Sequence, residues 1–273
     1  MSQSALWRWL KRALISLLVL IAILVGGIIV VMFYDANAGQ QTDAFTNITY
    51  IATDGTELLG YLAEPSGTGP HPGVLLLHEW WGLNEEITHI ADALAAEGYM
   101  VFVPDAYRGQ LATQFPGALY LRLGTPEADI FADIDAGLAY LHSLPNVDVT
   151  RVASWGFCFG GEQSLQLALR QPDKLAAMIM YYGSVETDAE RLRPLLQAQP
   201  ILGIFGDEDA QIPVSKVNAF QDALNEIGVS NTITIYPGVG HAFLTAENYD
   251  KPGASGDAWQ QTLAFLEAVI GNR

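Results

Sequence analysis

The feature that most constrains this chain is the segment at residues 152–161, which reads VASWGFCFGG. A mostly apolar run leads into the pattern Gly-x-Cys-x-Gly-Gly, and residues 162–170 follow with helical spacing. This pattern is typical of a nucleophile elbow, a sharp turn that carries a strand into a helix and exposes its central side chain. Glycines are needed around that side chain because a Cβ there would collide with neighbouring backbone. The central residue is Cys158, the one cysteine in the chain.

Cys158 has two interpretations at this stage. A thiolate is a strong nucleophile, so a neighbouring base or cation is enough to activate it. The alternative is a structural side chain, because free cysteine is among the residue types most often buried. The glycine pattern around Cys158 favours the elbow.

An apolar run near the amino terminus predicts a membrane span. Residues 13–33 are 21 residues without a charge, dominated by Leu, Ile and Val. A helix of this length spans roughly 31 Å, which matches the hydrocarbon core of a bilayer. Arg8, Lys11 and Arg12 precede the run, and no basic residue follows before Arg108. We therefore expect residues 1–12 to be a cytoplasmic tail and residues 13–33 a transmembrane helix.

A cleaved signal peptide is the alternative, with secretion after cleavage near Ala38, since Ala36-Asn37-Ala38 is an acceptable cleavage site. The apolar part of a signal peptide usually has about 7–15 residues, so the longer run here favours a retained anchor. Residues 34–44 have the composition of a short linker. The prediction is a single-pass protein of the inner or plasma membrane, with its main domain on the periplasmic side.

The charge balance excludes one class of partner. The chain has 30 acidic and 13 basic residues, a formal net charge of −17. Nucleic-acid binding requires cations that replace phosphate counterions, so we expect no nucleic-acid partner. The single cysteine also excludes an intramolecular disulfide.

Residues 45–273 alternate between predicted strands and helices. Strands are predicted at residues 47–53, 57–63, 73–78, 100–103, 152–157, 177–182, 201–205 and 232–236, and helices at 85–97, 125–143, 162–170, 214–227 and 257–270. The first two strands flank Asp54-Gly55, which predicts an antiparallel hairpin. The remaining alternation predicts one α/β domain, with a mostly parallel sheet and helices on both faces.

Polar and aromatic residues follow several of the predicted strands. In open α/β sheets, ligands bind outside the carboxyl ends of the strands. The order of Cys158, an acidic residue and His241 is that of a nucleophile, acid and base. An imidazole can take the thiol proton and later protonate a leaving group, and a carboxylate can hold its other nitrogen. From the residues alone, Asp207, Glu208 and Asp209 are equal candidates for the acid.

The chain resembles the dienelactone hydrolase family over about residues 45–270. The motifs that carry this resemblance are His78-Glu79-Trp80-Trp81-Gly82-Leu83-Asn84, Pro104-Asp105-x-Tyr107, Gly156-Phe157-Cys158-Phe159-Gly160-Gly161, Gly206-x-x-Asp209-x-x-x-Pro213 and Gly240-His241-x-Phe243. The resemblance implies an α/β-hydrolase fold without a metal or organic cofactor. It also implies that Asp209 is the acid, while Asp207 caps the turn.

The resemblance further implies a role for Glu79, which in the family interacts with the resting thiol and moves when substrate binds. A carboxylate near Cys158 would compete with His241 for the thiol proton and keep the nucleophile protonated. The backbone amides of Trp80 and Phe159 are the expected oxyanion hole, because one donor follows the nucleophile directly.

Two positions depart from the family pattern. Family members bind a substrate carboxylate with arginines near Pro-Asp-x-Tyr and just after His-x-Phe. Arg108 is displaced by one residue from the first position, and Thr245 occupies the second. Arg108 and Trp81 remain the predicted substrate-binding residues, and a neutral or aromatic ester or lactone suits the site as well as a carboxylated one.

The predicted function is hydrolysis of a small ester or lactone through a Cys158–His241–Asp209 triad and a thioester intermediate. One alternative is a binding protein that kept the fold and lost the chemistry. A second alternative is a thiol redox protein, because an exposed cysteine outside the cytoplasm can oxidise.

Overall fold

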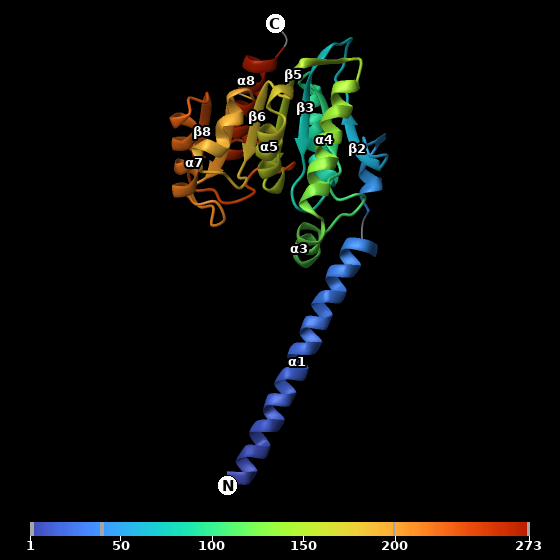
Figure 1. Ribbon diagram of the computed structural model, residues 1–273, viewed down its shortest axis with the longest axis vertical. Coiled ribbons are helices and arrows are strands. Elements are labelled where there is room, and N and C mark those ends of the chain that lie inside the picture. The colour runs from blue at the N-terminus through green and yellow to red at the C-terminus, as the bar shows by residue number, and fades with distance from the viewer. Residues whose placement is uncertain (1–2, 39–40, 199, 272–273) are drawn as a thin grey trace.

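A long amino-terminal helix, α1 (Gln3–Ala38), projects from one end of an α/β domain (Figure 1). The computed structural model describes residues 3–38, 41–198 and 200–271. Helix α1 continues past the expected end of the apolar span at Phe33, so residues 34–38 of the predicted linker are helical. A short 3-10 turn, η1 (Thr42–Phe45), takes up the end of that linker. Residues 39–40 of the linker lie outside the described residues.

The domain is built on one eight-stranded sheet in the order β1-β2-β4-β3-β5-β6-β7-β8. Its strands are β1 (Ile48–Ile51), β2 (Glu57–Ala63), β3 (His71–Leu77), β4 (Met100–Pro104), β5 (Val147–Phe157), β6 (Ala177–Tyr181), β7 (Ile201–Gly206) and β8 (Asn231–Tyr236). β1 and β2 form the predicted antiparallel hairpin, and β2 is also antiparallel to β4. The strands from β4 to β8 are parallel, which confirms the predicted fold class.

Helices cover both faces of the sheet. They are α2 (Glu85–Ala96), α3 (Phe115–Gly124), α4 (Glu127–Ser143), α5 (Phe159–Arg170), α6 (Ala189–Leu192), α7 (Val214–Glu226) and α8 (Ala254–Ile270), with 3-10 turns η2 (Pro172–Lys174) and η3 (Arg193–Leu196). Leu75 and Leu77 of β3 pack into the core beneath α4, α5 and α7, while Val74 and Leu76 pack beneath α2 and α8. Alternate residues of a strand point to opposite faces, so a continuous apolar run fits a strand buried on both sides.

Helix α3 is the main element that the sequence analysis did not predict. The start of α3 lies beside Asp35, although Thr113, just before the helix, is 78 positions after Asp35 in the sequence. The Asp35 carboxylate accepts the Thr113 amide at 3.0 Å, the Thr113 hydroxyl at 2.7 Å and the Gln114 amide at 2.9 Å. These contacts satisfy donors at the start of α3, as a capping side chain does. The end of α1 therefore packs against α3, at the lower end of the domain in Figure 1.

Gly117 makes this packing possible. A Cβ at Gly117 would overlap the Asp35 carboxylate, which is 5% exposed. The first turn of α3 can therefore approach Asp35 only because residue 117 lacks a side chain.

Candidate active site

The chain turns sharply at Cys158, between the end of β5 and the first residue of α5. Its backbone has φ +53° and ψ −114°, which is strained for a residue with a side chain. A Cβ on Gly156 would overlap the Gly160 carbonyl, and one on Gly160 would overlap the Leu77 carbonyl. The glycines of Gly-x-Cys-x-Gly-Gly are therefore required sterically, as the sequence pattern predicted.

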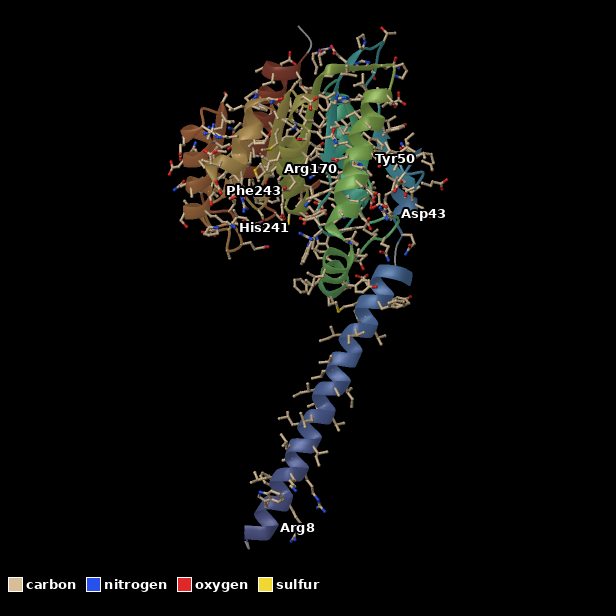
Figure 2. All side chains as sticks on the ribbon, viewed as in Figure 1. Arg8, Asp43, Tyr50, Arg170, His241 and Phe243 are labelled. Carbon is tan, nitrogen blue, oxygen red and sulfur yellow. The ribbon has the colours of Figure 1, made fainter. Side chains whose placement is uncertain are left out.

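Three side chains from separate loops meet at this turn. Nε2 of His241 lies 3.0 Å from Sγ of Cys158, and Nδ1 lies 2.7 Å from Oδ2 of Asp209. Cys158 follows β5, Asp209 follows β7, and His241 follows β8. Figure 2 shows His241 at the lower edge of the sheet, on the side of the domain that faces α1. The fold therefore aligns a thiol, an imidazole and a carboxylate in one hydrogen-bonded row.

The structure separates Asp209 from the other two candidate acids. The Asp209 side chain has no exposed surface, and its Oδ1 accepts the amides of Gln211 at 2.7 Å and Ile212 at 3.0 Å. These bonds hold the carboxylate while its Oδ2 faces His241. Asp207 instead accepts the Gly238 amide at 2.7 Å and is exposed, which places it at the turn.

The thiol of Cys158 is neutral at ordinary pH. Burial raises its pKa to about 12, and the negative charge of Glu79 adds to this effect, while the Phe159 amide opposes it. A protonated thiol donates its hydrogen to Nε2, and the Nδ1 hydrogen of the imidazole is donated to Asp209. The Cys158 sulfur becomes a strong nucleophile only when its proton moves from Sγ to Nε2 of His241.

Cys158 and His241 open into a cavity of about 440 Å³. This volume falls in the range of about 300–1,000 Å³ that is usual for small-molecule sites. Its apolar walls include Trp80, Phe115 and Phe159. Arg122 of α3 also lines it, with the guanidinium carbon 5.4 Å from the centre of the Phe159 ring.

Trp80 and Phe159, the predicted oxyanion-hole residues, line the same cavity as Cys158. Within the described residues, neither backbone amide donates a hydrogen bond to a protein oxygen. The Phe159 amide lowers the pKa of the thiol, so it lies close to Sγ. An amide without a protein acceptor is able to donate to a negatively charged oxygen of a ligand.

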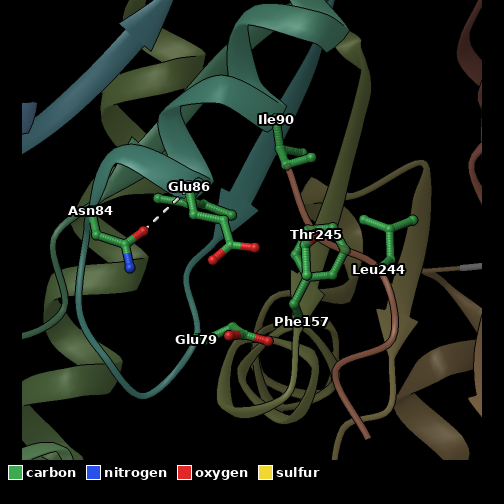
Figure 3. Close-up of a pocket in the computed structure, with 8 residues that line it drawn as sticks. Glu79, Asn84, Glu86, Ile90, Phe157, Leu244 and Thr245 are labelled. Carbon is green, nitrogen blue, oxygen red and sulfur yellow. Dashed lines mark hydrogen bonds between the residues drawn. The ribbon is translucent and has the colours of Figure 1, made fainter. Parts of the chain in front are cut away.

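Glu79 lines a second, smaller cavity, which Figure 3 shows. The cavity is lined by Glu79, Glu86, Phe157, Leu244 and four other residues, and the carboxylates of Glu79 and Glu86 face one another in Figure 3. Burial, followed by the charge of Glu86, raises the pKa of Glu79 to about 7. In the part of the chain that the structure describes, the Glu79 carboxylate makes no hydrogen bond.

His78 fixes the loop that carries Glu79 and Trp80. Its Nδ1 donates to the Glu79 carbonyl at 2.6 Å, and its Nε2 accepts the Ala106 amide at 3.1 Å. Burial lowers the pKa of His78 to about 4, so the ring is neutral. His78 therefore links the loop after β3 to the loop after β4.

The structure does not bring Arg108 or Trp81 into the catalytic cavity. The Arg108 guanidinium donates to both oxygens of Asp133, at 2.7 and 3.0 Å, and Asp129 lies 3.4 Å away. Trp81 lines a neighbouring cavity and packs edge-on against Trp80, with ring centres 5.3 Å apart.

The arginine that reaches the cavity is Arg122, which the sequence analysis missed together with α3. One signal for this helix was present in the sequence. Pro116 is the second residue of the mostly apolar stretch 115–124, and proline is common in the first turn of a helix.

Sequence comparison identifies relatives over nearly the whole domain. A sequence profile of the dienelactone hydrolase family matches residues 58–270. A candidate carboxymethylenebutenolidase of Synechocystis sp. is 30% identical over 247 residues, covering 85% of this chain and all of that protein. The protein usf of Aquifex pyrophilus is 31% identical over 228 residues, covering 80% of this chain and 96% of that protein.

Solved structures share the fold. A candidate dienelactone hydrolase from Klebsiella pneumoniae superposes with a TM-score of 0.64 at 27% identity, covering 81% of this chain and 99% of that chain. The dienelactone hydrolase-like phosphotriesterase P91 has a TM-score of 0.69 at 23% identity, covering 82% and 98%. In each comparison the unmatched share of this chain is similar in size to α1 together with the residues that follow it.

Proposed function

The chain belongs to the dienelactone hydrolase family, whose members hydrolyse carboxylic esters and lactones, and we propose that this hydrolase acts through a thioester on Cys158. The observation that carries the proposal is the row from Sγ of Cys158 through His241 to Asp209, with separations of 3.0 and 2.7 Å. A small ester or lactone is the proposed substrate, bound in the cavity beside Trp80 and Phe159.

In the first half of the reaction, Nε2 of His241 removes the thiol proton while Sγ attacks the carbonyl carbon. The carbonyl π electrons move to its oxygen, which the amides of Trp80 and Phe159 stabilise. The carbon–oxygen bond to the leaving group then breaks, and His241 gives its proton to the departing alkoxide or phenoxide. The product of this half is a thioester on Cys158 and a free alcohol.

In the second half, a water molecule attacks the thioester while His241 removes one of its protons. The carbon–sulfur bond breaks, and Sγ recovers the proton from the imidazole. Asp209 holds the Nδ1 hydrogen and stabilises the imidazolium in both halves. For a lactone the alcohol and acid remain one molecule, which is released only after this step.

We propose that Glu79 restrains the thiol between turnovers. Its charge is the second largest cause of the raised thiol pKa. When Glu79 is ionised, its charge destabilises the thiolate, so a premature thiolate is suppressed. This position suits a restraint more than a proton donor, because Glu79 lies in the neighbouring cavity.

We also propose that α1 is a retained membrane anchor with the catalytic domain on the periplasmic side. Trp7–Asp35 is long and apolar enough to cross a bilayer, and an 18-residue window within it has a mean hydropathy of 3.2. The basic residues that precede the span favour a cytoplasmic amino terminus. Cleavage near Ala38 would separate Asp35 from Thr113 and Gln114, so the cap of α3 favours retention over a removed signal peptide.

The two alternative functions have less support. A thiol redox protein needs an accessible thiolate, whereas burial holds the pKa of Cys158 near 12. A binding protein without chemistry has no need to keep Asp209 and His241 in hydrogen-bonded alignment with the sulfur.

Hydrolysis of p-nitrophenyl acetate by the full chain in detergent tests the proposal. Wild-type protein should release p-nitrophenol and show a transient mass increase of one acetyl group. Cys158→Ala should abolish both signals while keeping the unfolding temperature. Unchanged hydrolysis in Cys158→Ala would refute the assignment of the nucleophile.

A further inference from the structure

We propose that helix α3 lies on the outer surface of the bilayer and that the catalytic cavity receives amphiphilic esters from that surface. This inference rests on the hydrolase and anchor functions proposed above. The proposed substrate class is an ester whose apolar chain or ring makes it partition into the membrane interface.

The first argument is the position of α3 relative to α1. Tyr34 is 64% exposed at the end of the apolar span, and the next residue, Asp35, binds the start of α3. The polar layer of a bilayer is roughly 5–7 Å thick on each side, and a helix with side chains is about 10 Å across. A helix joined to the first polar residue after the span therefore lies at the depth of the lipid headgroups.

The second argument is the surface of α3. Outside α1, six large apolar or aromatic side chains are exposed among the described residues, and three of them belong to α3. These are Phe115 at 60%, Tyr120 at 36% and Leu123 at 75%. Tyr120 and Leu123 are separated by about one helical turn, so they lie near the same face. Aromatic and apolar side chains of this kind are typical of helices that lie in a membrane interface.

The third argument is charge. The chain carries 30 acidic residues, yet residues 106–126 contain none. A surface that approaches phosphate headgroups avoids carboxylates, because like charges repel across a medium of low dielectric. The segment around α3 is thus the part of the domain best suited to contact lipid.

The fourth argument connects this surface to the sulfur. Phe115 is exposed on the outside of α3 and also lines the catalytic cavity. Its ring packs edge-on against Trp80, with centres 5.3 Å apart, and Trp80 lines the same cavity as Cys158. The apolar part of a substrate that moves from the lipid surface past Phe115 therefore contacts aromatic side chains until it reaches Cys158.

A labelling experiment tests the placement of α3. In a Cys158→Ala background, Leu123→Cys and, as the control, Val149→Cys each provide one site for a fluorescent label. Val149 is also exposed, but it lies near the start of β5. It is roughly 26 Å along the strand from Phe157, the last strand residue before Cys158. In phosphatidylcholine vesicles that contain nitroxide-labelled lipid, the label at 123 should be quenched several-fold more than the label at 149. Equal, weak quenching at both sites would overturn the placement.

An activity experiment tests the source of the substrate. Leu123→Asp should lower hydrolysis of p-nitrophenyl decanoate dissolved in vesicles by roughly fivefold, since about 1 kcal/mol of interfacial contact is lost. Hydrolysis of water-soluble p-nitrophenyl acetate should not change, because Leu123 does not line the cavity. Val149→Asp is the matched control and should alter neither substrate.

The outcomes separate this inference from the proposed function. Unchanged decanoate hydrolysis in Leu123→Asp, with acetate hydrolysis intact, would overturn the interfacial substrate and leave the triad standing. Failure of wild-type protein to hydrolyse acetate would overturn the proposed function and the substrate class together, while lipid quenching still decides where α3 lies. The label at 123 could instead respond to the amount of protein in the vesicles and not to the amount of nitroxide-labelled lipid. That result would assign α3 to a contact with a second copy of the chain and overturn its placement on lipid.

Discussion

Sγ of Cys158 lies 3.0 Å from Nε2 of His241, although burial raises the pKa of the thiol to about 12. The thiol is therefore uncharged at rest, and the nucleophile appears only as the imidazole takes the proton. A neutral thiol resists adventitious alkylation and oxidation better than a standing thiolate does. It also makes the alignment of the imidazole essential, which leads to the first prediction.

Asp209→Asn should lower kcat/KM for p-nitrophenyl acetate by roughly two to four orders of magnitude, because the amide cannot stabilise the imidazolium and favours the wrong tautomer. Asp207→Asn is the matched control, two residues earlier, and should retain most activity because Asp207 contacts only the turn at Gly238. Steady-state kinetics on both variants check this. Equal losses would mean that the loop, rather than the Asp209 carboxylate, supports catalysis.

Glu79→Gln should lower the pKa of the Cys158 thiol by on the order of one pH unit, because it removes a nearby negative charge. The variant should therefore react with iodoacetamide roughly tenfold faster at pH 9. The pKa of Glu79 is about 7, so wild type and variant should converge well below that pH, where wild-type Glu79 is protonated. Glu86→Gln is the control, and its alkylation rate at pH 9 should match the wild type. A Glu79→Gln rate that stays at the wild-type value would remove Glu79 as a restraint.

His78 should make the fold sensitive to acid. Its folded pKa is about 4 against an ordinary value of 6.5, so below pH 6.5 only the unfolded chain takes up the proton. The stability that His78 contributes is complete above pH 6.5 and decreases as the pH falls toward 4, by about 3 kcal/mol in full. Unfolding temperatures at pH 7 and pH 5 should differ less in His78→Gln than in wild type. His89→Gln, an exposed control, should keep the wild-type difference.

Gly160→Ala should destabilise the domain by roughly 3 kcal/mol, because its Cβ would overlap the Leu77 carbonyl of the adjacent strand. Gly124→Ala is the control, since a Cβ there meets no atom within 4 Å. Thermal unfolding should show a clear loss for the first variant and none for the second. A fully stable Gly160→Ala protein would show that the turn relaxes more easily than its contacts imply.

The sheet and the turn were predictable because their signals are local. The run from Val74 to Leu77 alternates between two buried faces, so each residue in it is apolar. The glycines around Cys158 respond to backbone contacts within a few residues and from the adjacent strand. Both patterns reflect sterics that any sequence adopting this fold must satisfy.

Helix α3 and the roles of the arginines depended on contacts between distant segments. Asp35 caps α3 from another helix, and Asp133 holds Arg108 from α4. No spacing near Arg108 or Arg122 indicates which one reaches the cavity. The same applies to Glu79, whose side chain enters the neighbouring cavity beside Phe157 and Leu244.

The assignments of Cys158, His241, Asp209 and Glu79 to roles in catalysis remain predictions, and the variants of Cys158, Asp209 and Glu79 above test them. The distances supply the alignment those roles need. The family supplies the class of reaction, and kinetics on the full chain will connect the two.

The cap formed by Asp35 has a practical consequence. A chain shortened to begin after α1 would lack the apolar span, but it would also leave two amides and a hydroxyl at Thr113 and Gln114 without the Asp35 carboxylate that now accepts them. Because α3 also supplies Phe115 and Arg122 to the cavity, such a shortened enzyme would carry a loosened wall beside its nucleophile. Rates measured on it would describe an altered enzyme, because α1 holds the start of the helix that forms one wall of the cavity.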